Sequence, residues 1–80
     1  MKTDLIKIPG VGKILKQHFI ALGITNVEAL IDKNPEQMYE EDKKRLGGEL
    51  DRCVLYVYRL SVEYAKTRDE NLKWWDFKDK

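Results

Sequence analysis

The residues best suited to chemistry lie near the start of the chain, in the segment Ile8–Lys13, which reads Ile-Pro-Gly-Val-Gly-Lys. Two glycines in a tight turn allow backbone conformations that other residues avoid, and they leave the N–H groups of the turn unobstructed. A helix is expected to begin directly afterwards, and its first N–H groups are unpaired and lie at the positive end of the helix dipole. Together these groups would form a site for an anion such as phosphate.

The charges around this turn agree with an anion site. Between Leu5 and Asn26 the chain has three lysines, Lys7, Lys13 and Lys16, and no acidic residue. The whole chain is nearly neutral, because 15 basic and 14 acidic residues leave a net charge of +1. Positive charge is therefore concentrated around one turn, although the protein as a whole has no strong field.

Other kinds of chemistry fit the sequence poorly. The turn lacks the third glycine of a dinucleotide-binding fingerprint, and Lys13 is not followed by the hydroxyl residue of a P-loop. One cysteine and one histidine are too few for a zinc cluster, and we expect the histidine, His18, to be a solvated helix position. The acidic run Glu40–Asp42 has no apolar pocket pattern beside it, so catalytic carboxylates are not indicated. We expect a non-catalytic protein without a cofactor.

Five helices are expected to position these residues, and no strand is predicted. The 80 residues contain 42% hydrophobic and 36% charged residues, which is typical of one small folded domain. Glycines and prolines divide the chain, and apolar residues recur at helical spacing between them, as in the expected core stripe of Ile14, Leu15, Phe19 and Leu22. The expected helices span about Thr3–Lys7, Lys13–Leu22, Val27–Asp32, Pro35–Leu46 and Glu49–Lys66.

The last of these helices is unusually apolar. From Cys53 to Val62 the only charge is Arg59, and Arg52, Arg59, Glu63 and Lys66 line one narrow face. We expect Arg59 and Glu63 to pair across one turn, and Cys53 to be buried. Two interpretations of the apolar surface are open: the helix is surrounded by the rest of the chain, or it forms a homodimer interface.

The segment after this helix is charged except for three aromatic residues, Trp74, Trp75 and Phe77. Aromatic side chains carry a large hydrophobic area, so we expect them to fold back against the last helix. A surface for a protein partner and a platform on which nucleobases stack are the alternatives.

The segment from Leu5 to Ile24 resembles the helix-hairpin-helix motif of proteins that bind DNA without reading its sequence. Its core is Ile8–Lys13, and Leu22-Gly23-Ile24 matches the usual exit from the motif. In that family two hairpins and a connector helix form a five-helix unit. The resemblance therefore implies an all-α, five-helix tandem helix-hairpin-helix (SAM-like) fold over residues 1–80. Its parts would be a first motif at about 3–24, a connector at about 26–33, a second motif at about 35–66 and an aromatic tail at 67–80.

The chain as a whole is similar to a small bacterial group, the pathogenicity-locus family, which is sometimes labelled mitomycin-resistance-like. Three segments carry this resemblance: Ile8–Lys13, Asp51–Arg59 and Lys73–Phe77. The family implies a fold more clearly than an activity.

Carried over to this chain, the motif implies DNA-phosphate binding by Gly10, Val11, Gly12, Lys13, Ile14 and Lys16. In some proteins with this motif, carbonyl groups of the turn hold a monovalent cation, and here these would belong to Ile6, Ile8 and Val11. The second hairpin is degenerate, with Gly47, Gly48 and Arg52 as its candidate contacts. Glu49 and Asp51 stand beside its glycines and would repel phosphate.

We therefore expect weak, salt-sensitive, sequence-independent binding to double- or single-stranded DNA. The alternative is a protein-protein interaction module, or a homodimer, that uses the apolar last helix and the surface of Trp74, Trp75 and Phe77. No segment has the length and apolar character of a signal peptide or a membrane span. We expect a cytoplasmic protein that does not bind membranes.

Overall fold

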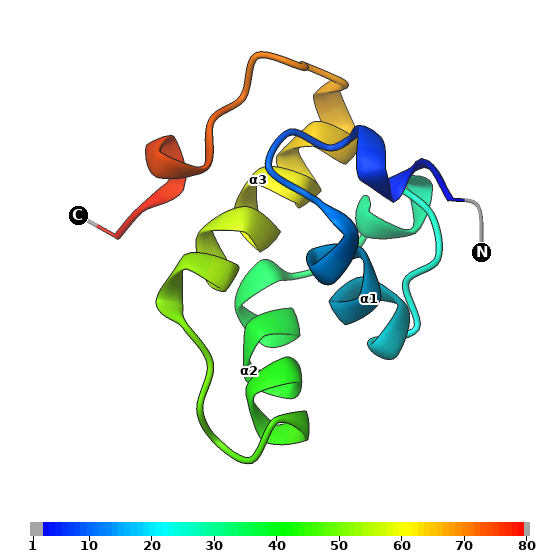
Figure 1. Cartoon of the computed structure of the whole chain (residues 1–80). Coiled ribbons are helices and arrows are strands. Elements are labelled where there is room, and N and C mark those ends of the chain that lie inside the picture. Colours follow the sequence, from blue (N-terminus) through cyan, green and yellow to red (C-terminus); the bar gives the residue numbers. More distant parts are fainter. Residues whose placement is uncertain (1–2, 80) are drawn as a thin grey trace.

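Three α-helices form the body of the molecule: α1 (Lys13–Ala21), α2 (Pro35–Arg45) and α3 (Arg52–Thr67). Three short 3₁₀ helices lie before, between and after them: η1 (Asp4–Lys7), η2 (Glu28–Leu30) and η3 (Trp74–Phe77) (Figure 1). The structure is a computed structural model that describes residues 3–79, and this part of the chain contains no strand. The first two residues and the last residue of the predicted 1–80 domain lie outside the described residues.

The predicted five-helix tandem fold, with its degenerate second hairpin, is wrong, whereas the all-α class is confirmed. Only three of the five expected segments are α-helices within residues 3–79. The segment expected at Thr3–Lys7 is the four-residue η1, and the expected connector helix is the three-residue η2. Segments this short cannot offset the cost of helix nucleation, and they form the tighter 3₁₀ turn instead.

The ends of the longer helices follow the sequence closely. Asn34 caps α2, since its side chain accepts the Gln37 N–H at 3.1 Å, and Pro35 occupies the first helical position. The last helix begins at Arg52, three residues later than expected, because the Asp51 side chain caps it. A residue that caps a helix has an extended backbone, so the helix cannot start before it.

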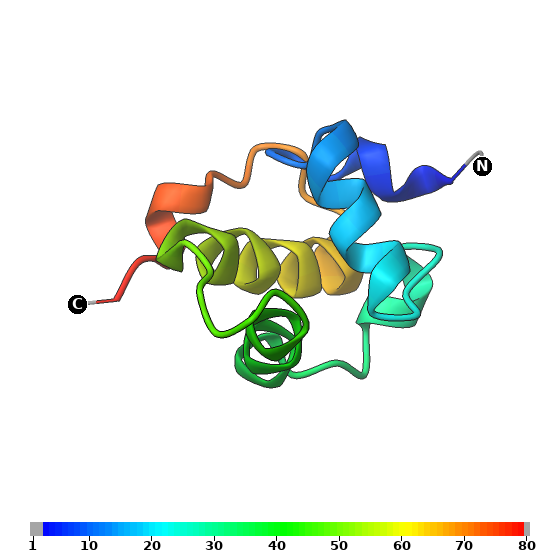
Figure 2. The same ribbon diagram turned by 60° about the horizontal axis from the view of Figure 1, so that its bottom comes forward.

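Helix α3 is the centre of the fold. It packs against α2, η3 and η2, and Figure 2 shows it crossing the middle of the molecule with α2 seen nearly end-on beside it. Its buried residues are Leu55, Val57, Tyr58, Leu60, Ser61, Val62, Tyr64 and Ala65. The prediction of a surrounded last helix is therefore confirmed.

Three expectations about individual side chains are wrong. Cys53 is exposed, because it lies in the first turn of α3, outside the core. Ile14, expected in the apolar stripe of α1, is 74% exposed. Arg59 does not pair with Glu63; its guanidinium instead bonds Glu36 of α2 at 2.9 Å.

The segment after α3 folds back alongside it, as expected (Figure 1, orange to red). The Trp74 ring stacks on Tyr56 of α3, with 6.5 Å between the ring centroids and 5° between the planes. Trp74 and Phe77 are half-buried against the core, whereas Trp75 is 52% exposed. Among the described residues, no helix combines the length and the apolar character that crossing a membrane requires.

Candidate anion-binding site

The glycine turn, residues Ile8–Lys13, connects η1 to α1 and is closed from within. The Val11 N–H donates to the Ile8 carbonyl at 3.1 Å, and the Val11 side chain is buried. Gly10 has a φ of +83°, a conformation that L-residues with a side chain rarely adopt. Val11 and Gly10 therefore shape the turn and hold it on the core.

Gly12 differs from Gly10, because its backbone does not require glycine. It is the N-cap of α1 with a φ of −102°, which any residue can adopt. A Cβ atom built on Gly12 would meet no atom within 4 Å. Neither a positive φ nor crowding within the described chain therefore requires a glycine at this position.

The N-terminus of α1 is open. The Lys16 N–H donates to the Gly12 carbonyl at 3.0 Å, which closes the first turn of the helix. No side chain caps the helix, and within residues 3–79 the N–H groups of Gly12, Lys13 and Ile14 have no hydrogen-bond acceptor. By contrast, Asn34 caps α2 and Asp51 caps α3. The only α-helix in the described chain without a side-chain cap is thus the one that follows the glycine turn.

Three lysines lie close to these free N–H groups in the sequence. Lys7 and Lys13 are exposed and Lys16 is half-buried. None of the ion pairs between residues 3–79 involves these lysines. An anion at the start of α1 would therefore meet unpaired N–H groups, the positive end of a helix dipole and uncommitted ammonium groups.

Of the carbonyl groups assigned to a monovalent cation, those of Ile8 and Val11 lie on this turn and that of Ile6 lies in η1. The Ile8 carbonyl accepts the Val11 N–H, which leaves it one further lone pair. The carbonyls of Ile6 and Val11 accept no backbone hydrogen bond outside the helices of the described chain. Carbonyl oxygens are suitable ligands for a hard cation, and the cation site stays a prediction.

The second glycine pair is a structural turn with a closed helix start. Gly47 and Gly48 have φ values of +86° and +97°, so the turn between α2 and α3 requires glycine at both positions. The Asp51 side chain accepts the Cys53 N–H at 2.9 Å, and hydrogen bonding to this N–H lowers the pKa of Asp51. A carboxylate therefore already occupies the position that an incoming phosphate would take.

The predicted partner surface is mostly covered. Trp74 and Phe77 pack against the core, so Trp75 is the member of this set that remains exposed. The Lys73 ammonium lies 5.5 Å from the centre of the Trp75 ring. The structure thus places a single exposed indole here, beside a positive charge.

A buried carboxylate that the sequence reasoning missed ties the three α-helices together. Asp42 of α2 is fully buried and accepts hydrogen bonds from Tyr58 of α3 at 2.6 Å and from His18 of α1 at 2.7 Å. Arg45 adds an ion pair at 2.8 Å. Burial alone would raise the pKa of Asp42, but hydrogen bonds from Tyr58, His18 and Arg45 hold it below its ordinary value. The expectation that His18 is a solvated helix position is therefore wrong.

The spacing of α2 could have revealed this cluster. Met38, Tyr39 and Asp42 are the buried residues of α2, and their separations of one, three and four positions place them on one helix face. Asp42 was grouped instead with its acidic neighbours Glu40 and Glu41, which are exposed.

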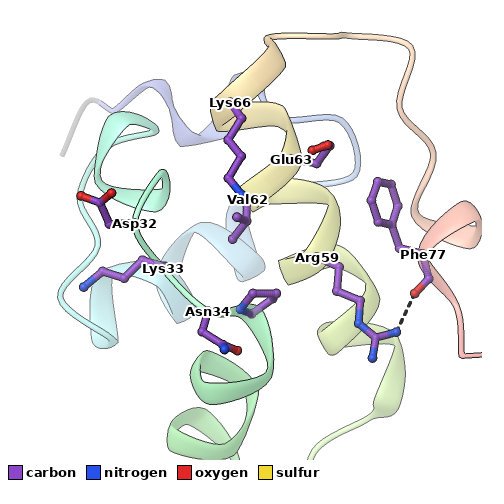
Figure 3. Close-up of a pocket in the computed structure, with 9 residues that line it drawn as sticks. Asp32, Lys33, Asn34, Arg59, Val62, Glu63, Lys66 and Phe77 are labelled. Atoms are coloured by element: carbon purple, nitrogen blue, oxygen red, sulfur yellow. Dashed lines mark hydrogen bonds between the residues drawn. The ribbon is translucent and has the colours of Figure 1, made fainter.

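A shallow cleft of about 450 Å³ lies away from the glycine turn (Figure 3). It is bounded by one face of α3, by the connection from η2 to α2, and by the C-terminal segment. Its lining residues are Asp32, Lys33, Asn34, Pro35, Arg59, Val62, Glu63, Lys66 and Phe77. Acidic and basic groups are mixed in this lining, so the cleft selects for neither sign of charge.

The fold and this geometry define a small all-α protein with an exposed, uncapped glycine turn. The chain belongs to the family described as Pathogenicity locus (Cdd1), whose model matches residues 2–80, as the sequence resemblance predicted. It is also similar to the mitomycin resistance protein McrB of Streptomyces lavendulae, with 29% identity over 75 residues. That alignment covers 94% of this chain and 70% of the relative. No solved structure matches the chain.

Proposed function

We propose that the protein binds the DNA backbone through the glycine turn, without catalysis and without reading the base sequence. The observation that carries this proposal is that the N-cap of α1 is a glycine, Gly12, and that no side chain caps the helix. The fold does not need a glycine there, and the absence of a side chain keeps the first N–H groups of α1 accessible. A Ser, Asp or Asn at this position would have stabilised the helix, but its oxygen would have filled the site that a phosphate uses.

The three lysines around the turn set the expected strength of binding. Together, Lys7, Lys13 and Lys16 would neutralise about three phosphates. The logarithm of the association constant should therefore fall with the logarithm of the salt concentration with a slope near −3. The net charge of +1 adds little long-range attraction. The resulting affinity for double- or single-stranded DNA is weak, with a dissociation constant that is roughly micromolar or higher.

The backbone of the glycine turn would make the contacts with DNA. The similarity of the first glycine turn to a helix-hairpin-helix motif supports phosphate contacts from Gly10, Gly12 and Ile14, with a monovalent cation on the neighbouring carbonyls. Val11 would hold the turn in place from the core. DNA is the proposed partner, and binding to DNA implies a location in the cytoplasm.

A protein-interaction role is the second candidate, and exposed Trp75 is the observation that favours it. The apolar face of α3 contributes little to such a surface, because the chain itself covers it. A partner, or a second copy of the chain, would have to use the single exposed indole and its surroundings.

Fluorescence anisotropy with a short labelled duplex and a labelled single strand tests the DNA proposal. Binding by the wild type should weaken steeply with salt, and Lys13→Glu should remove most of it. Lys33→Glu is the matched control, because it makes the same charge change at an exposed lysine of the η2–α2 connection. Absence of binding by the wild type at low salt, or equal losses in both variants, would contradict a site at the glycine turn.

A further inference from the structure

We propose that α3 carries a second phosphate-binding site, formed by Arg52, Arg59 and the Tyr56 hydroxyl, which the chain's own Asp79 carboxylate occupies in this structure. The proposal rests on the DNA-binding role proposed above for the source of the phosphate. Two of its members, Arg52 and Arg59, lie on the charged face that the sequence predicts for the last helix, and Arg52 is also a candidate contact of the second hairpin.

The geometry of the Asp79 carboxylate shows that this part of α3 binds an anion. One oxygen, Oδ2, accepts from Arg52 Nε at 2.8 Å and from the Tyr56 hydroxyl at 3.3 Å. The other oxygen, Oδ1, lies 2.9 Å from Arg59 Nη2. A phosphodiester also has one negative charge and two unesterified oxygens, so it can bridge the same pair of arginines.

The arginines are held in place by contacts that do not depend on Asp79. The Arg52 guanidinium lies over the ring of Tyr39, 5.6 Å from its centre, and that of Arg59 lies 5.8 Å from the centre of the Tyr56 ring. Arg59 also bonds Glu36 at 2.9 Å. Departure of Asp79 would therefore leave the two guanidinium groups close to their present positions, ready for another anion.

The charges around the site favour an incoming phosphate once the carboxylate leaves. Two arginines face two carboxylates, those of Asp79 and Glu36, so the group is neutral as it stands. Displacement of Asp79 leaves one uncompensated positive charge. Hydrogen bonds from Arg52 and Arg59 lower the pKa of Asp79 to about 2. At neutral pH Asp79 is therefore an anion that competes with phosphate for the two arginines.

Asp79 can be displaced without unfolding the domain. Its ion pairs are partly exposed, since its side chain is 41% exposed and that of Arg52 is 51% exposed. Exposed ion pairs contribute little to stability and weaken with salt. The rest of the segment is anchored separately by the stacking of Trp74 on Tyr56, so only the residues beyond Phe77 need to move.

Asp79→Asn tests the site, with Asp76→Asn as its matched control. Both changes remove one negative charge from the same segment, but Asp76 forms no ion pair among the described residues. We expect Asp79→Asn to bind a short labelled duplex on the order of tenfold more tightly at low salt, and Asp76→Asn to stay within about twofold of the wild type. Adding Arg52→Gln to Asp79→Asn should remove the gain. Circular dichroism verifies the fold of each variant.

The outcomes separate this site from the one at the glycine turn. Equal gains in the two aspartate variants, or no gain in Asp79→Asn, would overturn the second site and leave the first untouched. The same substitution in a Lys13→Glu background isolates α3. Binding that appears there only after Asp79→Asn supports the second site, even where the wild type binds no DNA and the glycine-turn proposal fails.

Discussion

His18 Nδ1 lies 2.7 Å from Asp42 Oδ2, and this contact joins the helix that carries the glycine turn to a fully buried carboxylate of α2. A carboxylate only accepts hydrogen bonds, so the histidine donates from Nδ1. The same oxygen accepts the Tyr58 hydroxyl at 2.6 Å. Because one carboxylate bonds all three α-helices, it fixes the orientation of α1 and thereby the direction in which the open turn faces.

Asp42→Asn should destabilise the fold by about 2–4 kcal/mol, because an amide in place of a buried carboxylate breaks the charge-assisted bonds and faces two donors with its own NH₂ group. Urea unfolding followed by circular dichroism measures this free energy. Glu41→Gln, at the exposed neighbouring position, should change it by less than about 0.5 kcal/mol. A similar small change for Asp42→Asn would show that the cluster does not hold the helices together.

Acid should weaken the fold through the same group. The pKa of Asp42 lies below the ordinary value of an aspartate, so the folded state binds a proton less readily than the unfolded chain. The stabilisation is complete above that value and is lost as the pH falls through the lower pKa of the folded state.

Urea unfolding between about pH 6 and pH 2 tests this dependence. The free energy of unfolding should fall more steeply for the wild type than for Asp42→Asn. The variant should keep a residual slope, since the pKa values of Asp51 and Asp79 are lowered as well. Identical slopes in the two proteins would show that Asp42 titrates in the folded state as it does in the unfolded chain.

The two tryptophans should differ in their effect on stability. Trp74 stacks on Tyr56 and packs against the core, so Trp74→Ala should cost about 2–3 kcal/mol. Trp75 is 52% exposed, and Trp75→Ala should cost less than about 1 kcal/mol. Thermal unfolding compares the two variants. An equally large loss for Trp75→Ala would show that its ring anchors the segment and is not free to meet a partner.

The boundaries of α2 could be predicted because they depend on local chemistry. An asparagine cap followed by proline starts α2, and the glycine pair ends it, whatever the rest of the chain does. The glycine turn was recognised for the same reason. Its shape depends on Gly10 and on the neighbours of Gly10 in the sequence.

Several features that the sequence analysis missed depend on contacts between distant segments, but the 3₁₀ geometry of η1 is a local feature. The sequence predicts a helix over about Thr3–Lys7, but the segment forms only the four-residue 3₁₀ helix η1. Helix propensity alone does not account for the cost of nucleating so short an α-helix. Burial of Asp42 requires donors from α1 and α3, which lie 24 and 16 positions away. Arg59 has a candidate partner one turn along its own helix, yet it bonds Glu36 of α2, 23 positions away.

Alanine at the two glycines of the turn should separate stability from binding. Gly10→Ala places a side chain at a φ of +83° and should cost about 1–2 kcal/mol. Gly12→Ala meets open space at a φ of −102° and loses only the modest preference for glycine over alanine at an N-cap, so it should lower the free energy of unfolding by less than about 1 kcal/mol. Its methyl group would nevertheless stand beside the N–H groups offered to phosphate, and DNA affinity should fall. Unfolding curves and anisotropy titrations on the same preparations check both effects.

Gly12→Asp should abolish DNA binding without destabilising the protein. Aspartate is a better N-cap than glycine, so the variant should be as stable as the wild type or more stable by a few tenths of a kcal/mol, roughly. Its carboxylate would accept the free N–H groups of α1 and repel phosphate, so salt-sensitive DNA binding should disappear. Asp51 already closes the start of α3 in this way. A stable variant that still binds DNA would show that the N-terminus of α1 is not the phosphate site, because the same N–H groups cannot serve both anions.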